Sequence, residues 1–403
     1  MKAFDLATAI AASERGAEQS QPATICYPFA GDSVGGSHLS LFGLLKNLDP
    51  ARYRVLIVPE DTTGKIADLF SAFEQCEDPG KPRVAFTPGE KFSVANFMRT
   101  FAGLPARIRF LRENDVRLVH TNDGRTHASW ALAARLAGIP LIWHHRADPK
   151  ALGLRLLAPL LASKVLTVSS FSLPKGRFWS AAHKAQVVFS PFDTSSTANR
   201  AEARERVLKL AGLPSDSLLL GYFGSFIPRK RPFLFVDVIA ELRARLDRPV
   251  YGLMFGEAVV PEMDAALREH IRTTGMEDAV RLMGFCSPGH EWIASCDQLI
   301  VPAFGEPLGR TLVEAMLVKT PVVATRSGGN EEALADDCGV LVEPESARAL
   351  ANGVEAVLSE PQKTQSMLDH AARSARERFS EARHVSTVVE VYEDLLNGGS
   401  TDR

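Results

Sequence analysis

The stretch VPAFGEPLGRTLVEAMLVKTPVVATRSGGNEE, residues 301–332, contains two strand-to-helix turns in succession. A strand is predicted to end within its first residues, and a helix is predicted to run from near Arg310 to Val318. A second strand at 321–326 then leads through two glycines, 328–329, into another helix. Strands that alternate with helices form βαβ units with a parallel sheet, so this stretch predicts an α/β fold.

The same alternation continues on both sides of this stretch, in two series. The predicted strands lie at 23–29, 53–59, 116–121, 140–145, 164–169 and 185–191 in the first series, and at 218–224, 250–256, 280–285, 298–303 and 321–326 in the second. A segment of small polar residues, 193–204, separates the two series, and its composition is typical of a linker.

Two series of this kind predict two Rossmann-like, doubly wound domains that face each other across a cleft. We place the first domain at 1–195, with 1–20 expected to be poorly ordered, and the second at 196–379. Within the final segment, 380–403, apolar residues at helical spacing over 380–396 predict one helix that packs across a domain surface. Because ligands bind outside the carboxyl ends of parallel strands, we expect the functional site in the cleft.

The composition argues against several classes of protein. The 403 residues suffice for two to three domains, and 45% of them are hydrophobic, which is too apolar for a disordered chain. Lys plus Arg total 46 and Asp plus Glu total 48, which disfavours a basic nucleic-acid-binding protein. The five cysteines include no CxxC pair, which argues against a disulfide framework or a zinc site. The charge balance therefore predicts no nucleic-acid partner. Residues 1–20 show no secretory signal, and together with the scattered cysteines this predicts a cytoplasmic protein.

For two segments, peripheral contact with the inner face of a membrane is one of two interpretations. Segment 151–168 is apolar but interrupted by Arg155, Pro159 and Lys164. It is therefore either a buried helix that runs into a core strand or a helix that lies on a membrane surface. Segment 98–112 is basic and amphipathic, and is either an ordinary surface helix or a docking site for anionic lipid.

Residues 306–314 combine charged side chains with a helix N-terminus. The unpaired N–H groups of a first helical turn suit a phosphate group. Arg310 and Glu314 lie four residues apart and share a helix face, whereas Glu306 precedes the helix. Glu306 is then placed for a sugar hydroxyl and Glu314 for a ribose diol. In the alternative interpretation, Glu306 is a solvated loop residue and Glu314 is paired to Arg310.

A basic triplet follows the first strand of the second series. In GYFGSFIPRKRP, residues 221–232, the side chains of Arg229, Lys230 and Arg231 cluster just beyond the strand end. Either they form a solvated basic turn, or Lys230 faces the cleft and neutralises phosphates.

The order of these motifs resembles a known family. The motif Gly-Ser-Phe-x-Pro-x-Lys at 224–230 is followed by Glu306-x7-Glu314, and then by Thr-Pro-Val-Val-Ala-Thr at 320–325 with its Gly-Gly turn. This combination resembles the family-4 retaining glycosyltransferases of glycosyl transferases group 1. The resemblance covers most of the chain and implies the GT-B fold, in which the last helix crosses back to the N-terminal domain.

The resemblance also implies roles for individual residues on the donor side. It places Glu306 against the hydroxyls of the donor sugar, Glu314 against the ribose and Lys230 against the phosphates. A backbone turn is expected to bind the diphosphate and the sugar, and an N-terminal glycine loop is expected to close over the phosphates. The turn comprises Leu308, Gly309, Arg310 and Thr311, and the loop contains Gly35 and Gly36.

The sequence departs from the family pattern at two positions. Where the family usually has an Arg after the strand-end glycine, this chain has Ser225, and Arg229 or Arg231 could supply the charge. Where the family usually has a His near the reacting sugar, this chain has Arg146, and Asn122 ends the neighbouring strand on the acceptor side. One of three neighbours is therefore expected to line the reacting sugar. The three are His144, His145 and Arg146. For the two histidines, the alternative is one packed ring and one exposed ring.

The resemblance implies retaining transfer of a sugar from a nucleoside diphosphate donor to a hydroxyl of a glycan or lipid-linked acceptor, in polysaccharide or glycolipid synthesis for the cell envelope. Glu306 and Lys230 are expected to be catalytic, and no enzyme nucleophile is implied. The chain contains no Asp-x-Asp, which holds a metal in many glycosyltransferases, so we expect neither a metal nor another cofactor. The alternatives are a sugar-nucleotide epimerase or hydrolase on the same fold, and a non-catalytic sugar-nucleotide-binding protein.

Overall fold

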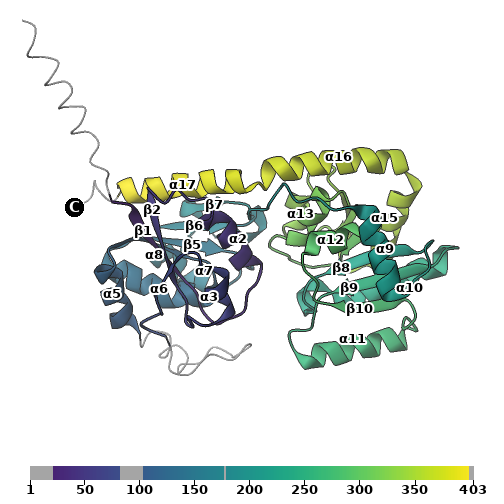
Figure 1. Ribbon diagram of the computed structural model, residues 1–403, viewed down its shortest axis with the longest axis horizontal. Helices are drawn as coiled ribbons and strands as arrows, with labels where there is room; N and C mark the ends of the chain where they lie inside the picture. The colour runs from purple at the N-terminus through teal and green to yellow at the C-terminus, as the bar shows by residue number, and fades with distance from the viewer. Residues whose placement is uncertain (1–20, 82–102, 177, 399–403) are drawn as a thin grey trace, which may run out of the picture.

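The computed structural model describes residues 21–81, 103–176 and 178–398. They form two lobes, each built around one parallel sheet with helices packed against it (Figure 1). The predicted α/β class with two doubly wound sheets is therefore confirmed. The expectation of poor order at 1–20, and the first five residues of the amphipathic segment 98–112, lie outside the described residues.

The first sheet contains seven strands in the order β3-β2-β1-β4-β5-β6-β7, and every neighbouring pair is parallel. Its strands are β1 (Ala23–Pro28), β2 (Tyr53–Val58), β3 (Glu74–Gln75), β4 (Val116–Thr121), β5 (Leu141–His145), β6 (Lys164–Thr167) and β7 (Ala185–Val187). The helices of this lobe are α2 (Gly36–Leu45), α3 (Lys65–Leu69), α5 (Leu104–Glu113), α6 (Gly124–Ala137), α7 (Leu152–Leu156) and α8 (Ala158–Leu161).

Both faces of the first sheet are buried. Ile25 and Tyr27 of β1 belong to an apolar cluster that includes residues of α2, whereas Cys26 belongs to a cluster with residues of α5 and α6. Side chains alternate between the two faces of a strand, so the apolar run of β1 serves two cores at once.

The second sheet contains six parallel strands in the order β10-β9-β8-β11-β12-β13. Its strands are β8 (Leu218–Phe223), β9 (Val250–Phe255), β10 (Val280–Gly284), β11 (Gln298–Val301), β12 (Val322–Thr325) and β13 (Val340–Val342). The helices of this lobe are α9 (Arg200–Ala211), α10 (Pro232–Arg245), α11 (Pro261–Thr273), α12 (Gly289–Ala294), α13 (Arg310–Leu317), α14 (Asn330–Ala333), α15 (Ala347–Ser359) and α16 (Pro361–Arg378). The last helix, α17 (Glu381–Gly398), follows α16.

The two sheets have a switch point at matching places. The first strand of each sheet is flanked by the strand that follows it and by a strand that arrives after a crossover, so β1 lies between β2 and β4, and β8 lies between β9 and β11. A crevice opens outside the carboxyl ends of such strands, where ligands bind in doubly wound sheets. The segments that follow β4, β8 and β11 hold Asn122, the basic triplet and Glu306, respectively.

The apolar segment 151–168 differs in part from the predicted buried helix that runs into a core strand. Its second half is the core strand β6, as expected, but the first half is two short helices, with Pro159 in the first turn of α8. Leu152, Leu156 and Leu160 are 65%, 55% and 58% exposed. The interpretation as a buried helix is therefore wrong for this face of α7 and α8.

The last helix crosses to the first lobe, as the resemblance implies. In Figure 1, α16 runs along the second lobe and α17 continues along the first. Val388, Val391 and Tyr392 of α17 are buried in the same cluster as β1 and α2. The Tyr392 hydroxyl lies 2.8 Å from the Tyr27 hydroxyl and 2.7 Å from Nδ1 of His120. In the described ranges, no helix combines the length and hydropathy needed to cross a bilayer.

Acidification is expected to destabilise the fold through His384 of α17. This ring is buried, with Nδ1 2.6 Å from the carbonyl oxygen of Phe189, and burial together with the charge of Arg146 lowers its pKa to about 3. His384 binds a proton near pH 6.5 in the unfolded chain but only near pH 3 in the folded chain. Its contribution to the free energy of unfolding is therefore complete above pH 6.5 and decreases as the pH falls toward 3. The cost at pH 5 is about 2 kcal/mol.

Urea denaturation at pH 7 and pH 5 measures this cost. The variant His384→Asn retains an amide donor for the Phe189 carbonyl and cannot titrate, so it should lose about 2 kcal/mol less than the wild type between the two pH values. The exposed His183 provides the control, since His183→Asn should show the wild-type pH dependence. An equal acid loss in His384→Asn and the wild type would contradict the assignment.

Candidate functional site

The candidate site lies where the two lobes meet, and Arg310 makes the main contact across this boundary. Its side chain leaves the start of α13 and reaches the first lobe, where NH1 lies 2.9 Å from the Ser40 hydroxyl and 3.3 Å from the Pro191 carbonyl oxygen. Its guanidinium also lies over the ring of Phe192, 4.1 Å from the centroid. A second contact joins Ser170 to the carboxylate of Glu332, at 2.6 Å from the amide and 2.9 Å from the hydroxyl.

Glu306 forms ion pairs with two cationic side chains on the second lobe. Its carboxylate lies 2.5 Å from the Arg229 guanidinium and 3.4 Å from Nζ of Lys230, and the residue is only 7% exposed. Burial by itself raises the pKa of Glu306, but Lys230 and Arg229 outweigh burial and hold the pKa below its ordinary value. The alternative that Glu306 is a solvated loop residue is therefore wrong.

The basic triplet divides into two parts. Arg229 and Lys230 lie on a 3₁₀ turn (Pro228–Lys230) after β8 and both contact Glu306. Arg231 instead pairs with Glu345 at 2.7 Å. Of the two arginines considered as replacements for the charge missing at Ser225, only Arg229 is therefore beside the site.

The two glycines 328–329 hold two turns of the chain together. A side chain at Gly328 would place Cβ 2.5 Å from the carbonyl oxygen of Glu306, and Cβ at Gly329 would lie 2.1 Å from that of Pro307. The Gly329 amide donates to the Glu306 carbonyl oxygen at 2.7 Å. These glycines therefore allow close approach of the backbone of the loop that carries Glu306.

Helix α13 begins with an N-terminus that no side chain caps. Gly309 is the N-cap residue, and the first turn contains no acidic residue. The positive end of the helix dipole therefore faces the crevice without a counter-charge from its own first turn. Leu308 is buried and Thr311 is half-buried, and the ligand contacts of this backbone turn stay predictions.

Glu314 lies one turn into α13 and is half-buried. Its carboxylate is 3.9 Å from Nε of Arg310, so the alternative pairing exists, but Arg310 makes its shorter contacts with Ser40 and Pro191. Burial raises the pKa of Glu314, and the nearby Arg310 and His290 oppose this effect. Its other oxygen faces Gly289, where a Cβ would lie at 3.1 Å. A small residue at 289 thus leaves room beside Glu314.

On the first lobe, Arg146 is the member of the predicted trio that reaches the site. Its NH1 lies 3.2 Å from the Ser190 hydroxyl, and its NH2 lies 3.4 Å from the Asn122 side-chain oxygen and 3.3 Å from Nδ1 of His144. No described carboxylate forms an ion pair with Arg146, and its Nε has no partner. Burial and the like charge of Arg310 lower the pKa of Arg146, although a guanidinium stays charged at neutral pH.

The two histidines of the trio are both packed inside the lobe. His144 is 0% and His145 is 4% exposed, so the alternative with one exposed ring is wrong. Nδ1 of His144 lies 3.1 Å from Nε2 of His120, and Nε2 of His145 lies 2.9 Å from the Asp148 carbonyl oxygen. Burial is the main cause that lowers the pKa of each, so both rings are neutral supports behind Arg146.

The N-terminal glycine loop contacts the second lobe. Gly36 begins α2, and a Cβ there would lie 2.8 Å from Cδ of Arg310. Gly35 is the N-cap residue, and its amide donates to Nδ1 of His38 at 3.1 Å. The structure thus brings the predicted loop to the start of α13, while contact with phosphates stays a prediction.

Sequence reasoning missed the polar residues that support this boundary. Ser40 contacts Arg310, Ser190 contacts Arg146, and the pKa of His38 is lowered by burial and by the charge of Arg146. A local signal existed for each: His38 and Ser40 lie in the first turns after the glycine pair, and Ser190 ends a predicted strand. In the described part of the chain, no three His, Cys, Asp or Glu side chains are grouped to hold a metal ion.

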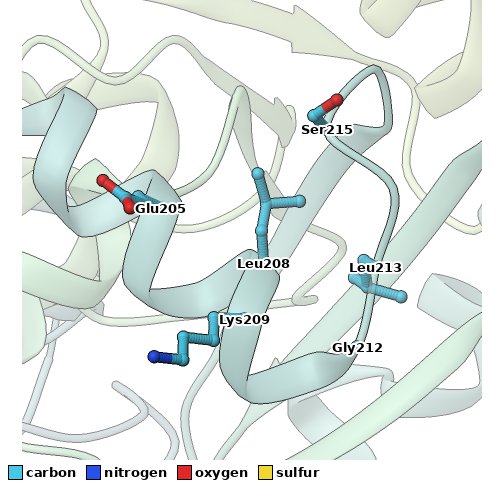
Figure 2. A pocket seen from close by; sticks show the side chains of 6 residues that line it. All are labelled: Glu205, Leu208, Lys209, Gly212, Leu213 and Ser215. Atoms are coloured by element: carbon cyan, nitrogen blue, oxygen red, sulfur yellow. The ribbon is translucent and has the colours of Figure 1, made fainter.

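A separate hollow lies away from this boundary, at the carboxyl end of α9. Figure 2 shows the six residues that line it. They are Glu205, Leu208, Lys209, Gly212, Leu213 and Ser215. None of them belongs to the predicted site. The hollow follows from the local turn, because Gly212 adopts a left-handed conformation with φ of +65° and ends the helix there.

Comparison with known proteins shows which sequences this chain resembles. The family described as Glycosyl transferases group 1 matches residues 204–375. The D-inositol 3-phosphate glycosyltransferase of Stackebrandtia nassauensis is 32% identical over 203 residues, which are 46% of this chain and 42% of that protein. The alpha-D-kanosaminyltransferase of Streptomyces kanamyceticus is 28% identical over 229 residues, 55% of this chain and 56% of that protein. The chain thus spans about half the length of the curated relatives it matches.

Solved structures match nearly the whole chain. HepE from Anabaena in complex with UDP and glucose gives a TM-score of 0.75 at 23% identity, over 92% of this chain and 99% of that chain. The sucrose-phosphate synthase of Thermosynechococcus elongatus gives 0.73 at 17% identity, over 93% and 100%. At such identities the match concerns the fold, and this fold is GT-B. Residues 204–375 of this chain thus match the family of glycosyl transferases group 1, and the chain has the two-domain GT-B fold.

Proposed function

We propose that this chain is a glycosyltransferase of the family-4 type, which moves a sugar from a nucleoside diphosphate donor to a hydroxyl acceptor with retention of the anomeric configuration. The observation that carries the proposal is the convergence of Glu306, Arg229 and Lys230 beside the uncapped start of α13. Two cations, one ionised carboxylate and a helix N-terminus suit a sugar diphosphate, whose parts are an anion and a set of hydroxyls.

The compared proteins support the same class of donor. Two relatives are transferases by name, and the HepE structure holds UDP and glucose. A nucleoside diphosphate sugar is accordingly our proposed donor for this chain, and a glycan or lipid-linked molecule is the proposed acceptor. Synthesis of a cell-envelope polysaccharide or glycolipid, a cytoplasmic location and peripheral contact with anionic lipid belong to the same proposal.

In this proposal, the residues of the second lobe stabilise the leaving diphosphate. Preorganised charge where negative charge develops is the largest catalytic effect available in most enzymes. Lys230, Arg229 and the first N–H groups of α13 provide that charge. Glu306, kept ionised by its two cations, accepts hydrogen bonds from sugar hydroxyls, and Glu314 accepts them from the ribose. Both carboxylates bind substrate, and neither is an enzyme nucleophile.

On the first lobe, the proposal assigns the reacting sugar to Arg146 and not to the two packed histidines. Its guanidinium is the group of the trio that faces Asn122, which follows β4, and Ser190, which follows β7. The second candidate is a non-catalytic sugar-nucleotide-binding protein. It is retained because Ser225 and Arg146 stand where the family usually has an Arg and a His.

Product analysis tests the activity. With a panel of UDP, GDP and ADP sugars and hydroxyl acceptors, we expect transfer that requires acceptor and yields a glycoside with the anomeric configuration of the donor. Release of free sugar or an isomerised donor without acceptor would favour the hydrolase or epimerase. Nucleotide binding with no product over the whole panel would favour the binding protein.

Activity is expected to be independent of divalent metal, because the chain lacks Asp-x-Asp and places Lys230 and Arg229 with the helix N-terminus instead. Initial rates with excess EDTA should equal those without it. Loss of activity in EDTA that Mn²⁺ restores would show that a metal is needed.

The variant Glu306→Gln is expected to lower kcat about a hundredfold while binding of the nucleoside diphosphate stays equal or tightens. The amide is nearly the same size as the carboxylate, but it no longer neutralises Arg229 and Lys230, so an anion meets more positive charge. Steady-state kinetics and a thermal-shift titration separate the two effects. Glu345→Gln removes a carboxylate from the exposed Arg231 pair and serves as the control that should keep wild-type values. Turnover of Glu306→Gln close to that of the wild type would contradict the role.

A further inference from the structure

An unusual group of exposed apolar side chains lies on the first lobe. Phe178 and Trp179 are 86% and 62% exposed, and Leu152, Leu156 and Leu160 are each more than half exposed. Monomeric soluble proteins rarely expose large contiguous apolar patches without an interaction to explain them.

The three leucines lie along one side of α7 and α8. Leu152 and Leu156 lie four residues apart on one face of α7, and Leu160 follows in α8. The opposite face is packed on the lobe: Leu154 and Ala158 are buried in a cluster with Trp143, and a Cβ at Gly153 would lie 3.1 Å from the Trp143 ring. The two helices are therefore firmly seated, and their leucines point outward because the inward positions are already filled.

The aromatic pair belongs to the same region of the lobe. Two residues after Trp179, Ala181 is buried in the cluster that contains Leu154 and Ala158. Lys184 then donates to the carbonyl oxygens of Pro159 and Ala162 at 2.8 and 2.6 Å. The chain that follows Trp179 is thus attached to α8. We call the five apolar side chains, together with the exposed Lys150, Arg155 and Lys175, the α7–α8 surface.

Positive charge predominates in this segment of the chain. Residues 148–184 contain six Lys or Arg (positions 150, 155, 164, 175, 177 and 184) but a single acidic residue, Asp148. A second copy of the chain docked on the same surface would bring like charges together across a two-fold axis. An anionic lipid surface instead pairs with the cations while Leu, Phe and Trp enter the headgroup boundary.

The surface adjoins the boundary between the lobes. Five residues separate Leu152 from Arg146, and Asp148 of this connection accepts a hydrogen bond from His145 through its carbonyl oxygen. On the other side, the ring of Phe171 lies 3.7 Å from where Cβ of Gly305 would be, and Lys175 lies 6.0 Å from the same ring. A bilayer on this surface therefore lies next to the first-lobe side of the candidate site.

We infer that the α7–α8 surface docks this protein on an anionic lipid bilayer and holds the cleft beside the headgroups. The amphipathic segment 98–112 is the poorer candidate, since Arg107 is 2% exposed and paired with Asp78 at 2.7 Å. That docking presents a lipid-linked acceptor to the cleft rests on the proposed function, whereas the docking itself does not.

Flotation of the full chain with vesicles tests the inference. Vesicles of phosphatidylcholine alone are compared with vesicles of equal parts phosphatidylcholine and phosphatidylglycerol, at low and high salt. We expect binding to the mixed vesicles that weakens with salt, and a loss of about tenfold in the double variant Phe178→Ser and Trp179→Ser. The variant Lys150→Ala with Arg155→Ala should lose binding mainly on the mixed vesicles. The control Phe285→Ser changes a 75% exposed ring on the second lobe and should bind like the wild type.

Separate readouts distinguish failure of the inference from failure of the proposed function. Nucleotide thermal shifts and transfer to a water-soluble acceptor should be unchanged in the double aromatic variant, which also shows that it folds. Wild-type protein that transfers sugar but does not bind mixed vesicles overturns the inference alone. A wild-type dimer that the aromatic variant converts to a monomer, without vesicle binding, overturns it in favour of a second copy. Vesicle binding without nucleotide binding supports the docking and removes the proposed function.

Discussion

The candidate site depends on one buried carboxylate that is kept ionised by two cations. A carboxylate as buried as Glu306 would be protonated more readily than in water, and a protonated acid is a poorer acceptor for sugar hydroxyls. Arg229 and Lys230 reverse that effect, and both come from the turn after β8, whereas Glu306 comes from the loop after β11. The pairing of these two strands therefore decides the charge of the site. Two cations against one anion leave the cluster positive, ready for a further anion.

The crossover helix supports the first-lobe half of the site through a buried chain of hydrogen bonds. Arg146 has only donors, so Nδ1 of His144 must accept from it, and the proton on Nε2 of His120 must then point toward His144. His120 is neutral because burial lowers its pKa, so its Nδ1 accepts from the hydroxyl of Tyr392 in α17. One consistent set of proton positions thus connects α17 to Arg146, and the last helix helps to orient a side chain of the candidate site.

The sequence indicates the second lobe of the site better than the first, for a physical reason. Glu306, Glu314 and Lys230 lie in short motifs next to strand ends, where local spacing determines their positions. The support of Arg146 by Ser190, and of Arg310 by Ser40, joins residues 44 and 270 positions apart, and no local pattern contains such a contact. The burial of His144 has the same origin, because its ring stacks on that of His384 in α17, which lies 6.1 Å away between centroids and is distant in the sequence.

The contacts between the lobes also constrain how a donor can enter. Arg310 contacts Ser40, Pro191 and the ring of Phe192, and its Cδ lies against Gly36, so the start of α13 and the glycine loop are in contact. A diphosphate bound at that helix N-terminus must therefore share the space with the Arg310 side chain or displace it. The charge of Arg310 lowers the pKa of Arg146, so the two guanidinium groups repel each other across the boundary between the lobes. An anion bound between the lobes offsets this repulsion, and the two arginines therefore favour an anionic donor there.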